Sequence, residues 1–331
     1  MADFSGLHDD LRHHEEFLAQ TSRRRVRTIR RSRGEKIFDA VNVFAMVLLC
    51  IVTIYPFWYA LVLSFNEGRN AAMGPLWIWP REFTLDNYVY VLNYPGLHDA
   101  FWVTLARVIV GPVIHVAVCL VAAYALSKRY LPARRALLLF FIVPMFIGGT
   151  TISFYVVNVR LGLLNNFLVY VIPGAFGFFT MVIMRTFVEG IPVELEESVF
   201  LDGGGYGVAF YSIVIPLSKA VIAAFLFFQV VNHWLDFYTT LLFITRRDLR
   251  VLQFLLYEVI HRNETQRMQE MATSIDAIRR MAERQVEAAT LPTPQVVKMA
   301  VMVTVTAPLL FIYPFFQKHF VKGMMIGSIK A

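Results

Sequence analysis

Residues 100–126 read AFWVTLARVIVGPVIHVAVCLVAAYAL, a run in which Arg107 is the single formally charged side chain. A helix of roughly 20 apolar residues spans the hydrocarbon core of a bilayer, so we predict a membrane-spanning helix here. The whole chain agrees with this prediction, because 57% of its 331 residues are hydrophobic and 17% are charged. In soluble domains about 45–50% of the residues are apolar and about 25% are charged. The composition therefore excludes an ordinary soluble globule.

Five other apolar runs are long enough to cross a membrane, so we predict six membrane-spanning helices and an all-α, polytopic membrane protein. Both cysteines, Cys50 and Cys119, lie inside apolar runs, which excludes a disulfide-stapled secreted module. The six predicted spans are residues 37–64, 100–126, 136–157, 164–187, 208 or later to 244, and 296–316.

The net charge of +7 lies mostly on one side of this predicted topology. Residues 1–36 carry nine basic residues against six acidic ones, the turn at 127–136 carries four basic residues, and three lysines follow residue 316. The loop at 64–100, on the other side, has two arginines against four acids. By the positive-inside rule both termini are cytoplasmic. The basic N-terminal cluster is thus expected to contact membrane lipid, and no nucleic-acid partner is expected.

Spans and charges together divide the chain into four parts. These are a basic cytoplasmic tail at 1–36, a first helix with its outside loop at 37–99, a core at 100–317 and a cytoplasmic tail at 318–331. The core includes a cytoplasmic loop at 189–206 and an outside segment at 245–295. Within that segment, apolar residues recur at steps of three and four over 263–288, which predicts an amphipathic helix. That helix either caps the protein's own surface or docks a partner.

Motifs of enzyme chemistry are missing from the sequence. It has no Gly-x-x-x-x-Gly-Lys-Ser/Thr phosphate loop and no Gly-x-Gly-x-x-Gly. None of its histidines and cysteines has the spacing of a metal site. We therefore predict no catalytic residue, no metal and no cofactor bound by this chain, and no enzymatic activity of its own. Energy for any work must come from a partner or from an ion gradient.

The predicted cytoplasmic loop at 189–206 reads EGIPVELEESVFLDGGGY. Pro192 suits the first turn of a helix, and acidic residues in that turn interact favourably with the helix dipole. Gly203 and the two glycines after it end the helix and permit a left-handed turn. The pattern predicts a short helix followed by a glycine hinge, exposed between two spans, with nothing inside the chain to move it.

The spacing of this loop resembles a known signature. Glu197, then Gly203, then Ile213-Val214-Ile215-Pro216 resemble the Glu-Ala-Ala, Gly, Ile-x-Leu-Pro motif of the permease subunits of binding-protein-dependent ABC importers. The departures are Ser198 and Val199, where the family has Ala-Ala, and Phe200, where it often has Arg.

Further motifs extend the resemblance over roughly residues 50–330. Their order is similar to that of the carbohydrate uptake family, and within it to the branch associated with oligosaccharides from plant or algal polysaccharides. The motifs are Tyr55-Pro56-Phe57, Ala122 to Ser127, Met145 to Gly149, Leu161-Gly162-Leu163, Ile191 to Glu197, Tyr313 to Lys318 and Lys322 to Ser328.

The resemblance implies the type I importer fold in a bacterial cytoplasmic (inner) membrane. It also implies ATP-driven import of a carbohydrate, and its branch indicates an oligosaccharide. It also implies four partners: two cytoplasmic ATPase subunits, which bind ATP and Mg, a second and different homologous permease, and an extracytoplasmic sugar-binding protein. The residues it implies for ATPase coupling are Glu194, Glu197, Ser198, Leu201, Asp202, Gly203, Ile213 and Pro216.

Polar residues form a stripe on the fifth predicted span. Gln229, His233, Asp236 and Thr240 follow one another at steps of four, three and four, so they share one helix face. Polar groups in hydrocarbon are costly and usually face a bundle interior or a water-filled path. The stripe either lines the substrate path or bonds to neighbouring helices. Aromatic platforms for a sugar ring in this region are Trp234 and Tyr238.

Arg107 is the one charged residue of the second span. It either binds an acidic sugar, snorkels, or pairs with an internal acid such as Asp236. His115 falls near the same face. If Arg107 and His233 both point into the path, the sequence favours an anionic oligosaccharide.

Two other classes of protein compete with the importer hypothesis. An ion-coupled secondary transporter predicts inverted repeats with buried acids at matched positions, and we find no such repeat. A membrane scaffold that recruits an extracytoplasmic partner leaves the spacing of 197–216 unexplained.

Overall fold

The computed structural model describes residues 32–74, 76–147, 149–261 and 293–327. Every regular element in these residues is helical, and the one β feature among them is an isolated bridge between Asn66 and Phe83. The all-α prediction is therefore confirmed for this part of the chain. The amphipathic helix predicted at 263–288 lies outside the described residues, as does almost all of the basic N-terminal tail.

The chain divides into two compact units, residues 1–56 and 57–331, with the boundary inside helix α2 (Arg33–Ser64). In the first unit the described residues form the N-terminal part of α2. Its apolar side chains are exposed on all sides, with Phe44 69% and Ile54 61% accessible. A helix that is apolar all round is typical of a segment whose solvent is lipid.

The second unit contains all the other helices. They are α3 (Gly68–Ala72), α4 (Asp86–Leu92), α5 (Leu97–Ser127), α6 (Arg134–Ile147), α7 (Thr151–Arg160), η1 (Phe167–Tyr170), α8 (Phe178–Glu189), α9 (Val193–Leu201), α10 (Tyr206–Ala209), η2 (Phe210–Val214), α11 (Ile215–Leu217), α12 (Lys219–Leu235), α13 (Tyr238–Phe243), η3 (Arg247–Leu249) and α16 (Pro294–Gly327); residues 252–261 are also helical.

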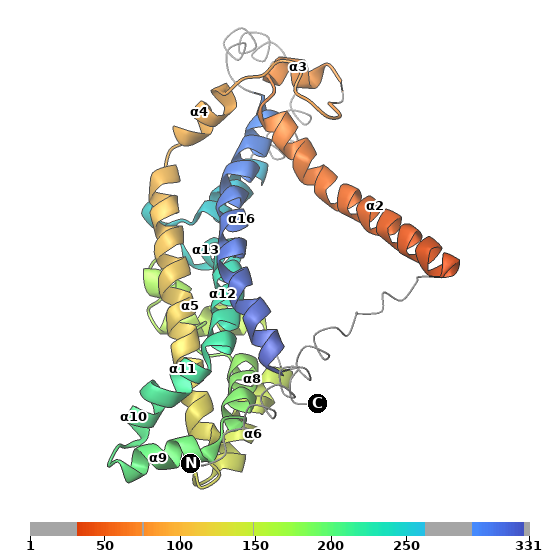
Figure 1. Cartoon of the computed structure of the whole chain (residues 1–331). Coiled ribbons are helices and arrows are strands. Elements are labelled where there is room, and N and C mark those ends of the chain that lie inside the picture. Colours follow the sequence, from red (N-terminus) through yellow and green to blue (C-terminus); the bar gives the residue numbers. More distant parts are fainter. Residues whose placement is uncertain (1–31, 75, 148, 262–292, 328–331) are drawn as a thin grey trace, which may run out of the picture. The chain divides into compact units, whose positions relative to one another are not determined.

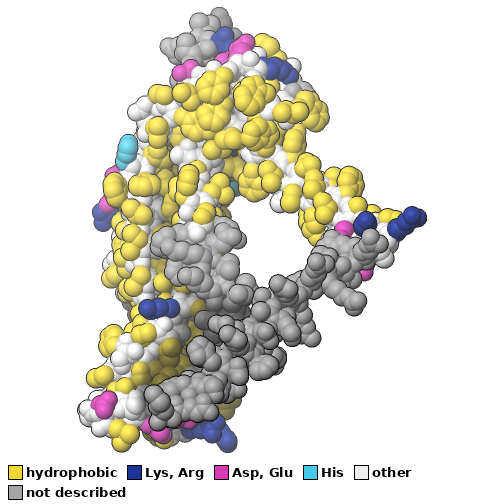
Figure 2. Space-filling view, in the orientation of Figure 1, with side chains coloured by type: hydrophobic (Ala, Val, Ile, Leu, Met, Phe, Trp, Pro, Cys, Tyr) yellow, Lys and Arg dark blue, Asp and Glu magenta, His cyan; other side chains and the backbone are white. Residues whose placement is uncertain are grey.

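Three helices of the described residues are long and apolar enough to cross a membrane: α2, α5 and residues 294–312 of α16. A fourth crossing is available if residues 206–217 and α12, which meet at a 75° bend, form one span. Hydrophobic side chains cover most of the visible surface of the described helices (Figure 2). Three of the six predicted spans thus correspond to long helices, and α16 continues beyond its predicted end at residue 316 to Gly327.

Besides the bent run at 208–244, two other predicted spans are not continuous helices. The run at 136–157 is divided between α6 and α7, because Gly149 interrupts it and the Thr150 hydroxyl caps α7 by accepting a hydrogen bond from the Ser153 N–H at 3.2 Å. The run at 164–187 holds only the short η1, a turn, and the twelve residues of α8. Pro173, Gly174 and Gly177 lie in that turn, where an unbroken helix is disfavoured.

Helix α5 is the centre of the second unit: α8 and α12 both pack on it, and α16 packs on α12 (Figure 1). Lipid tails are as apolar as leucine, so helices in a bilayer associate through close packing and polar contacts. Small residues of α5 allow the neighbouring helices to approach it closely. Ala123 is fully buried beside Met181 and Met184 of α8, and a Cβ added to Gly111 would lie 2.5 Å from the His233 ring of α12.

Two asparagines hold together the segment between α2 and α5. The buried Asn66 accepts hydrogen bonds on its side-chain oxygen from the backbone N–H groups of Arg81, at 2.8 Å, and Glu82, at 3.1 Å. The buried Asn87 amide donates to the carbonyls of Ser64 and Asn66 at 2.8 and 2.9 Å. Irregular backbone is thereby fixed by side chains where no helix satisfies its polar groups.

Replacing Asn87 with Ala should destabilise this segment by about 1–3 kcal/mol, because it leaves two buried carbonyls without their donor. The measurement is the midpoint of thermal unfolding of the purified complex, together with the rate of proteolysis within residues 65–96. The matched control is Asn93→Ala, because the Asn93 side chain is exposed; it should change stability by no more than about 0.5 kcal/mol. Equal effects of the two substitutions would contradict the assignment.

Candidate functional site

A cavity of about 270 Å³ lies between α5, α12 and the residues around η1. Of the predicted path residues, four line it: Arg107, Gln229, His233 and Asp236. The other lining residues are Phe154, Val169, Tyr170, Pro173, Gly174, Asn232 and Thr239. The polar stripe on α12 therefore meets polar groups from two other parts of the chain.

Arg107 connects α5 to the end of α12. Its guanidinium forms an ion pair with the Asp236 carboxylate, donates to the Asp236 carbonyl at 2.8 Å and donates through Nε to His233 Nδ1 at 3.3 Å. The guanidinium carbon lies 4.6 Å from the centre of the Tyr170 ring, a cation–π distance. The Arg107 side chain is 3% exposed. This arrangement is the pairing alternative of the sequence analysis rather than snorkelling.

Asp236 lies at the break between α12 and α13. One carboxylate oxygen accepts from the backbone N–H groups of Tyr238, at 2.8 Å, and Thr239, at 3.1 Å. The other accepts from the Thr239 hydroxyl at 2.6 Å, beside its contact with Arg107. The carboxylate therefore caps the start of α13 while it neutralises the arginine.

His115 forms a second polar contact between α5 and α12. Its Nδ1 lies 2.6 Å from the Gly174 carbonyl, which can only accept, so Nδ1 carries the proton. Its Nε2 then accepts from the Gln229 amide at 3.0 Å and the Thr180 hydroxyl at 3.1 Å. Gly177 leaves room for the ring, because a Cβ there would lie 2.9 Å from it.

The two predicted aromatic platforms do not line the cavity. Trp234 is 4% exposed, and its indole N–H donates to the Val305 carbonyl of α16 at 3.0 Å. Tyr238 is 47% exposed and is not among the lining residues. Tyr170 supplies the aromatic ring of the cavity instead, with its hydroxyl 2.8 Å from that of Thr240.

Sequence reasoning missed Tyr170, Asn232 and Thr239. Tyr170 comes from η1, in a run that apolar composition predicted to be a continuous helix. Asn232 and Thr239 each lie three residues after a member of the stripe, Gln229 and Asp236, so the spacing of polar residues could have found them. Thr239 follows the helix break at Asp236 and belongs to α13.

At the other end of α5, the loop predicted to couple to the ATPase contains the expected short helix, α9. Gly203 follows it with φ of +80°, a left-handed conformation that favours glycine. Among the predicted coupling residues Leu201 is the most exposed, at 88%. Within α9 and its C-terminal cap, the exposed side chains of this set are Glu194, Glu197, Ser198, Leu201 and Asp202. The helix thus presents acidic and apolar side chains outward together.

The two remaining coupling residues lie where the chain turns back toward α12. Ile213 is in η2, which is a π-helical turn, and Pro216 is in α11. Pro216 has no N–H for helical bonding, and the 75° bend follows it at Ser218. The motif therefore includes both the exposed helix and the bend.

An ion pair attaches α9 to the end of α5. Glu196 pairs with Lys128 at the end of α5, with side chains only 12% and 16% exposed, and Lys128 Nζ lies 4.3 Å from the Tyr124 ring. Nearby, desolvation and a hydrogen bond with Tyr206 raise the pKa of Tyr130 above its usual value, so its phenol stays protonated. Glu196 was not among the predicted coupling residues, although the two loops predicted to be cytoplasmic carry opposite charges.

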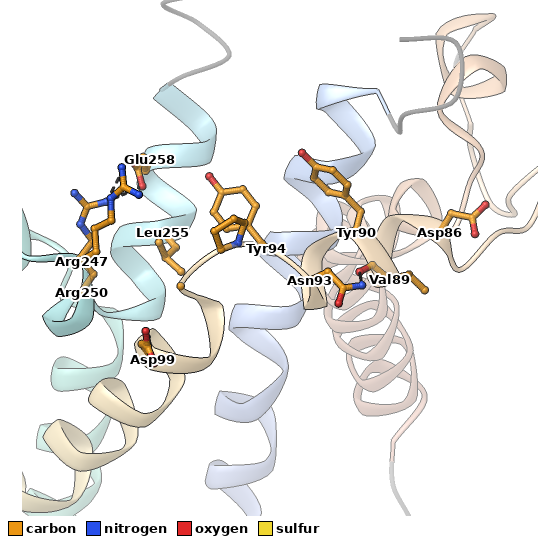
Figure 3. A pocket seen from close by; sticks show the side chains of 12 residues that line it. Asp86, Val89, Tyr90, Asn93, Tyr94, Asp99, Arg247, Arg250, Leu255 and Glu258 are labelled. Atoms are coloured by element: carbon orange, nitrogen blue, oxygen red, sulfur yellow. Dashed lines mark hydrogen bonds and ion pairs between the residues drawn. The ribbon is translucent and has the colours of Figure 1, made fainter. Parts of the chain in front are cut away.

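A second and larger cavity, of about 840 Å³, lies at the opposite end of α5 from α9 (Figure 3). Tyr90 and Tyr94, four residues apart, extend from α4 and the turn after it. Across the cavity, Arg250 forms an ion pair with Glu258 at 3.3 Å. The other charged residues that line it are Asp86, Asp99 and Arg247.

Comparisons with known proteins agree with this architecture. The family described as "Binding-protein-dependent transport system inner membrane component" matches residues 115–326. Protein LplC of Bacillus subtilis is 34% identical over 92% of this chain and 99% of its own length. The polygalacturonan/rhamnogalacturonan transport system permease protein YtcP of the same organism is 28% identical over 89% of this chain and 99% of its own.

Among solved structures, a bacterial ABC transporter involved in the import of the acidic polysaccharide alginate contains a chain that superposes with a TM-score of 0.77. That chain is 23% identical, and the match covers 88% of this chain and 100% of that one. It shows the all-helical permease fold. The family match also decides against the ion-coupled transporter and the scaffold. This chain is therefore a multi-pass member of the family of inner-membrane permease components of binding-protein-dependent ABC transport systems.

Proposed function

We propose that this permease imports an oligosaccharide, and that its sugar passes along the cavity between α5 and α12. The observation that carries the proposal is the lining of that cavity, in which amide, hydroxyl and imidazole groups stand beside the Tyr170 ring. Such groups donate to and accept from sugar hydroxyls, and the ring offers an apolar face. Relatives named as carbohydrate permeases support it, including the arabinooligosaccharides permease protein AraQ of Halalkalibacterium halodurans, 21% identical over 86% of this chain.

In the proposed transporter this chain works with four other proteins. A second, different permease and two ATPases complete the membrane complex, and an extracytoplasmic sugar-binding protein delivers the sugar. ATP and Mg bind to the ATPases. Each ATPase docks one coupling helix, and here the exposed Leu201 supplies an apolar contact flanked by Glu197 and Asp202. Closure of the ATPases then moves α9 and, through Lys128, the end of α5.

We also propose six crossings with both termini in the cytoplasm. α6 with α7 forms one crossing and η1 with α8 another, each as an interrupted helix. Non-helical backbone is tolerated at membrane depth where it is buried in protein or lines a cavity. The interruption at η1 fits that rule, because Tyr170 and Gly174 both line the cavity.

Replacing Gly203 with Ala should lower ATP-driven sugar uptake by about tenfold, because an L-residue in this left-handed conformation costs roughly 1–2 kcal/mol and shifts the end of α9. The measurement is uptake into proteoliposomes, with ATP hydrolysis followed in parallel. The matched control is Gly207→Ala, since Gly207 is in a helix and a Cβ there meets no atom within 4 Å. Normal uptake by the Gly203 variant would contradict the coupling role.

The Lys128–Glu196 ion pair gives a second prediction for the same loop. Lys128→Glu should lower uptake by about tenfold or more, because it places two carboxylates together at a half-buried site. Glu196→Lys should do the same, and the exchanged pair, Lys128→Glu with Glu196→Lys, should recover most of the uptake. Since ATPase assembly also depends on α9, co-purification of the ATPase is measured for each variant. If the exchanged pair does not recover sugar uptake, the proposal that this ion pair transmits motion is wrong.

A further inference from the structure

We infer that the sugar carried by this permease is electrically neutral, because the cavity beside Arg107 has no unbalanced positive charge with which to bind a carboxylate, and the larger cavity has a net negative lining. The inference rests on the proposed function and adds the charge class of the substrate. The sequence analysis favoured an anionic oligosaccharide if Arg107 and His233 both face the path. Both residues do line the cavity, yet the contacts they make there favour a neutral sugar.

Arg107 is already neutralised within the chain. Its Nε, Nη1 and Nη2 atoms all donate to groups of the α12 end, and Asp236 supplies a full opposite charge in direct contact. A sugar carboxylate entering the cavity would meet the field of an ion pair rather than that of a cation. It would also have to displace Asp236, which caps α13. Binding an acid here would therefore disrupt the helix break.

The two histidines add no charge either. His233 Nδ1 accepts a hydrogen from Arg107, so this nitrogen carries no proton. His115 donates through Nδ1 to a carbonyl and accepts on Nε2 from Gln229. His233 therefore adds no charge to the lining, and His115 is not among the lining residues. The formal charge of the cavity lining is zero, from one arginine and one aspartate.

The other polar lining groups are those that suit sugar hydroxyls. Gln229, Asn232, Thr239 and Tyr170 each combine donor and acceptor atoms without a charge. Transferring a carboxylate from water into such surroundings costs far more free energy than transferring a hydroxyl that finds a partner. The chemistry of the lining therefore discriminates by charge.

The larger cavity at the other end of α5 points the same way and is independent of Arg107. Figure 3 shows Arg247 and Arg250 on one side of it, with Glu258 beside them and Asp99 nearby. With Asp86, three carboxylates oppose two guanidiniums, and the Arg250–Glu258 ion pair cancels one of each. The remaining charge is negative, which repels an acidic oligosaccharide.

The test compares two ligands that differ only in charge, trigalacturonate and its neutral trimethyl ester. The complete permease–ATPase complex is placed in lipid nanodiscs without the binding protein, so that selection by that protein does not contribute. Binding is measured by calorimetry. For the wild-type complex we expect the ester to bind at least about tenfold more tightly than the acid.

Asp236→Asn is the decisive variant. The asparagine oxygen can still accept from the N–H groups that start α13, but Arg107 then lacks its counter-charge. The ratio of affinities should move about tenfold or more toward the acid. The control is the double variant Arg107→Gln with Asp236→Asn, which restores a neutral cavity and should restore the preference for the ester.

Tighter binding of the acid by the wild type, or an unchanged ratio in Asp236→Asn, would overturn the inference. Binding of neither ligand, in a complex that still imports a sugar, would overturn it too and leave the proposed function standing. If the wild-type complex imports no sugar when ATP and the binding protein are supplied, the proposed function itself fails.

Discussion

The contact between Arg107 and Asp236 is the interaction on which the rest of the membrane region depends. An arginine in the middle of an apolar helix is costly unless it has a partner, and α5 must therefore lie where α12 can supply one. The partner sits at the end of α12, so the same carboxylate also starts α13. One ion pair thereby sets the position of α5 against α12 and the place at which the fifth predicted span breaks.

α5 joins the two parts of the molecule that a transporter must connect. It carries Arg107 and His115 beside the cavity, and its last turn leads directly to Lys128, which holds α9 through Glu196. A helix of 31 residues is about 45 Å long. In the proposed mechanism, a displacement of α9 therefore reaches the cavity through a single element. Close packing against α8 and α12 gives α5 little room to bend instead.

Apolar run length predicted α2, α5 and α16 well, because each is a nearly uninterrupted helix whose side chains match its surroundings. It failed for 136–157 and 164–187, where Gly149, Gly174 and Gly177 were outweighed by the apolar residues around them. The composition of a segment indicates whether it lies in lipid or in water, but it does not show whether its helix is continuous. Of the residues predicted for the path, Gln229, His233 and Asp236 line the cavity, whereas Trp234 and Tyr238, which were chosen by residue type alone, do not.

The sequence by itself determined the class of the protein and the position of the short helix α9, because membrane solubility depends on composition and the signature around Gly203 depends on local spacing. Which polar groups meet was decided only by the tertiary structure. Arg107 and Asp236 are 129 positions apart, and no periodicity within either helix says that they touch. That contact converts an arginine that looked available for an acidic sugar into one whose charge is already balanced.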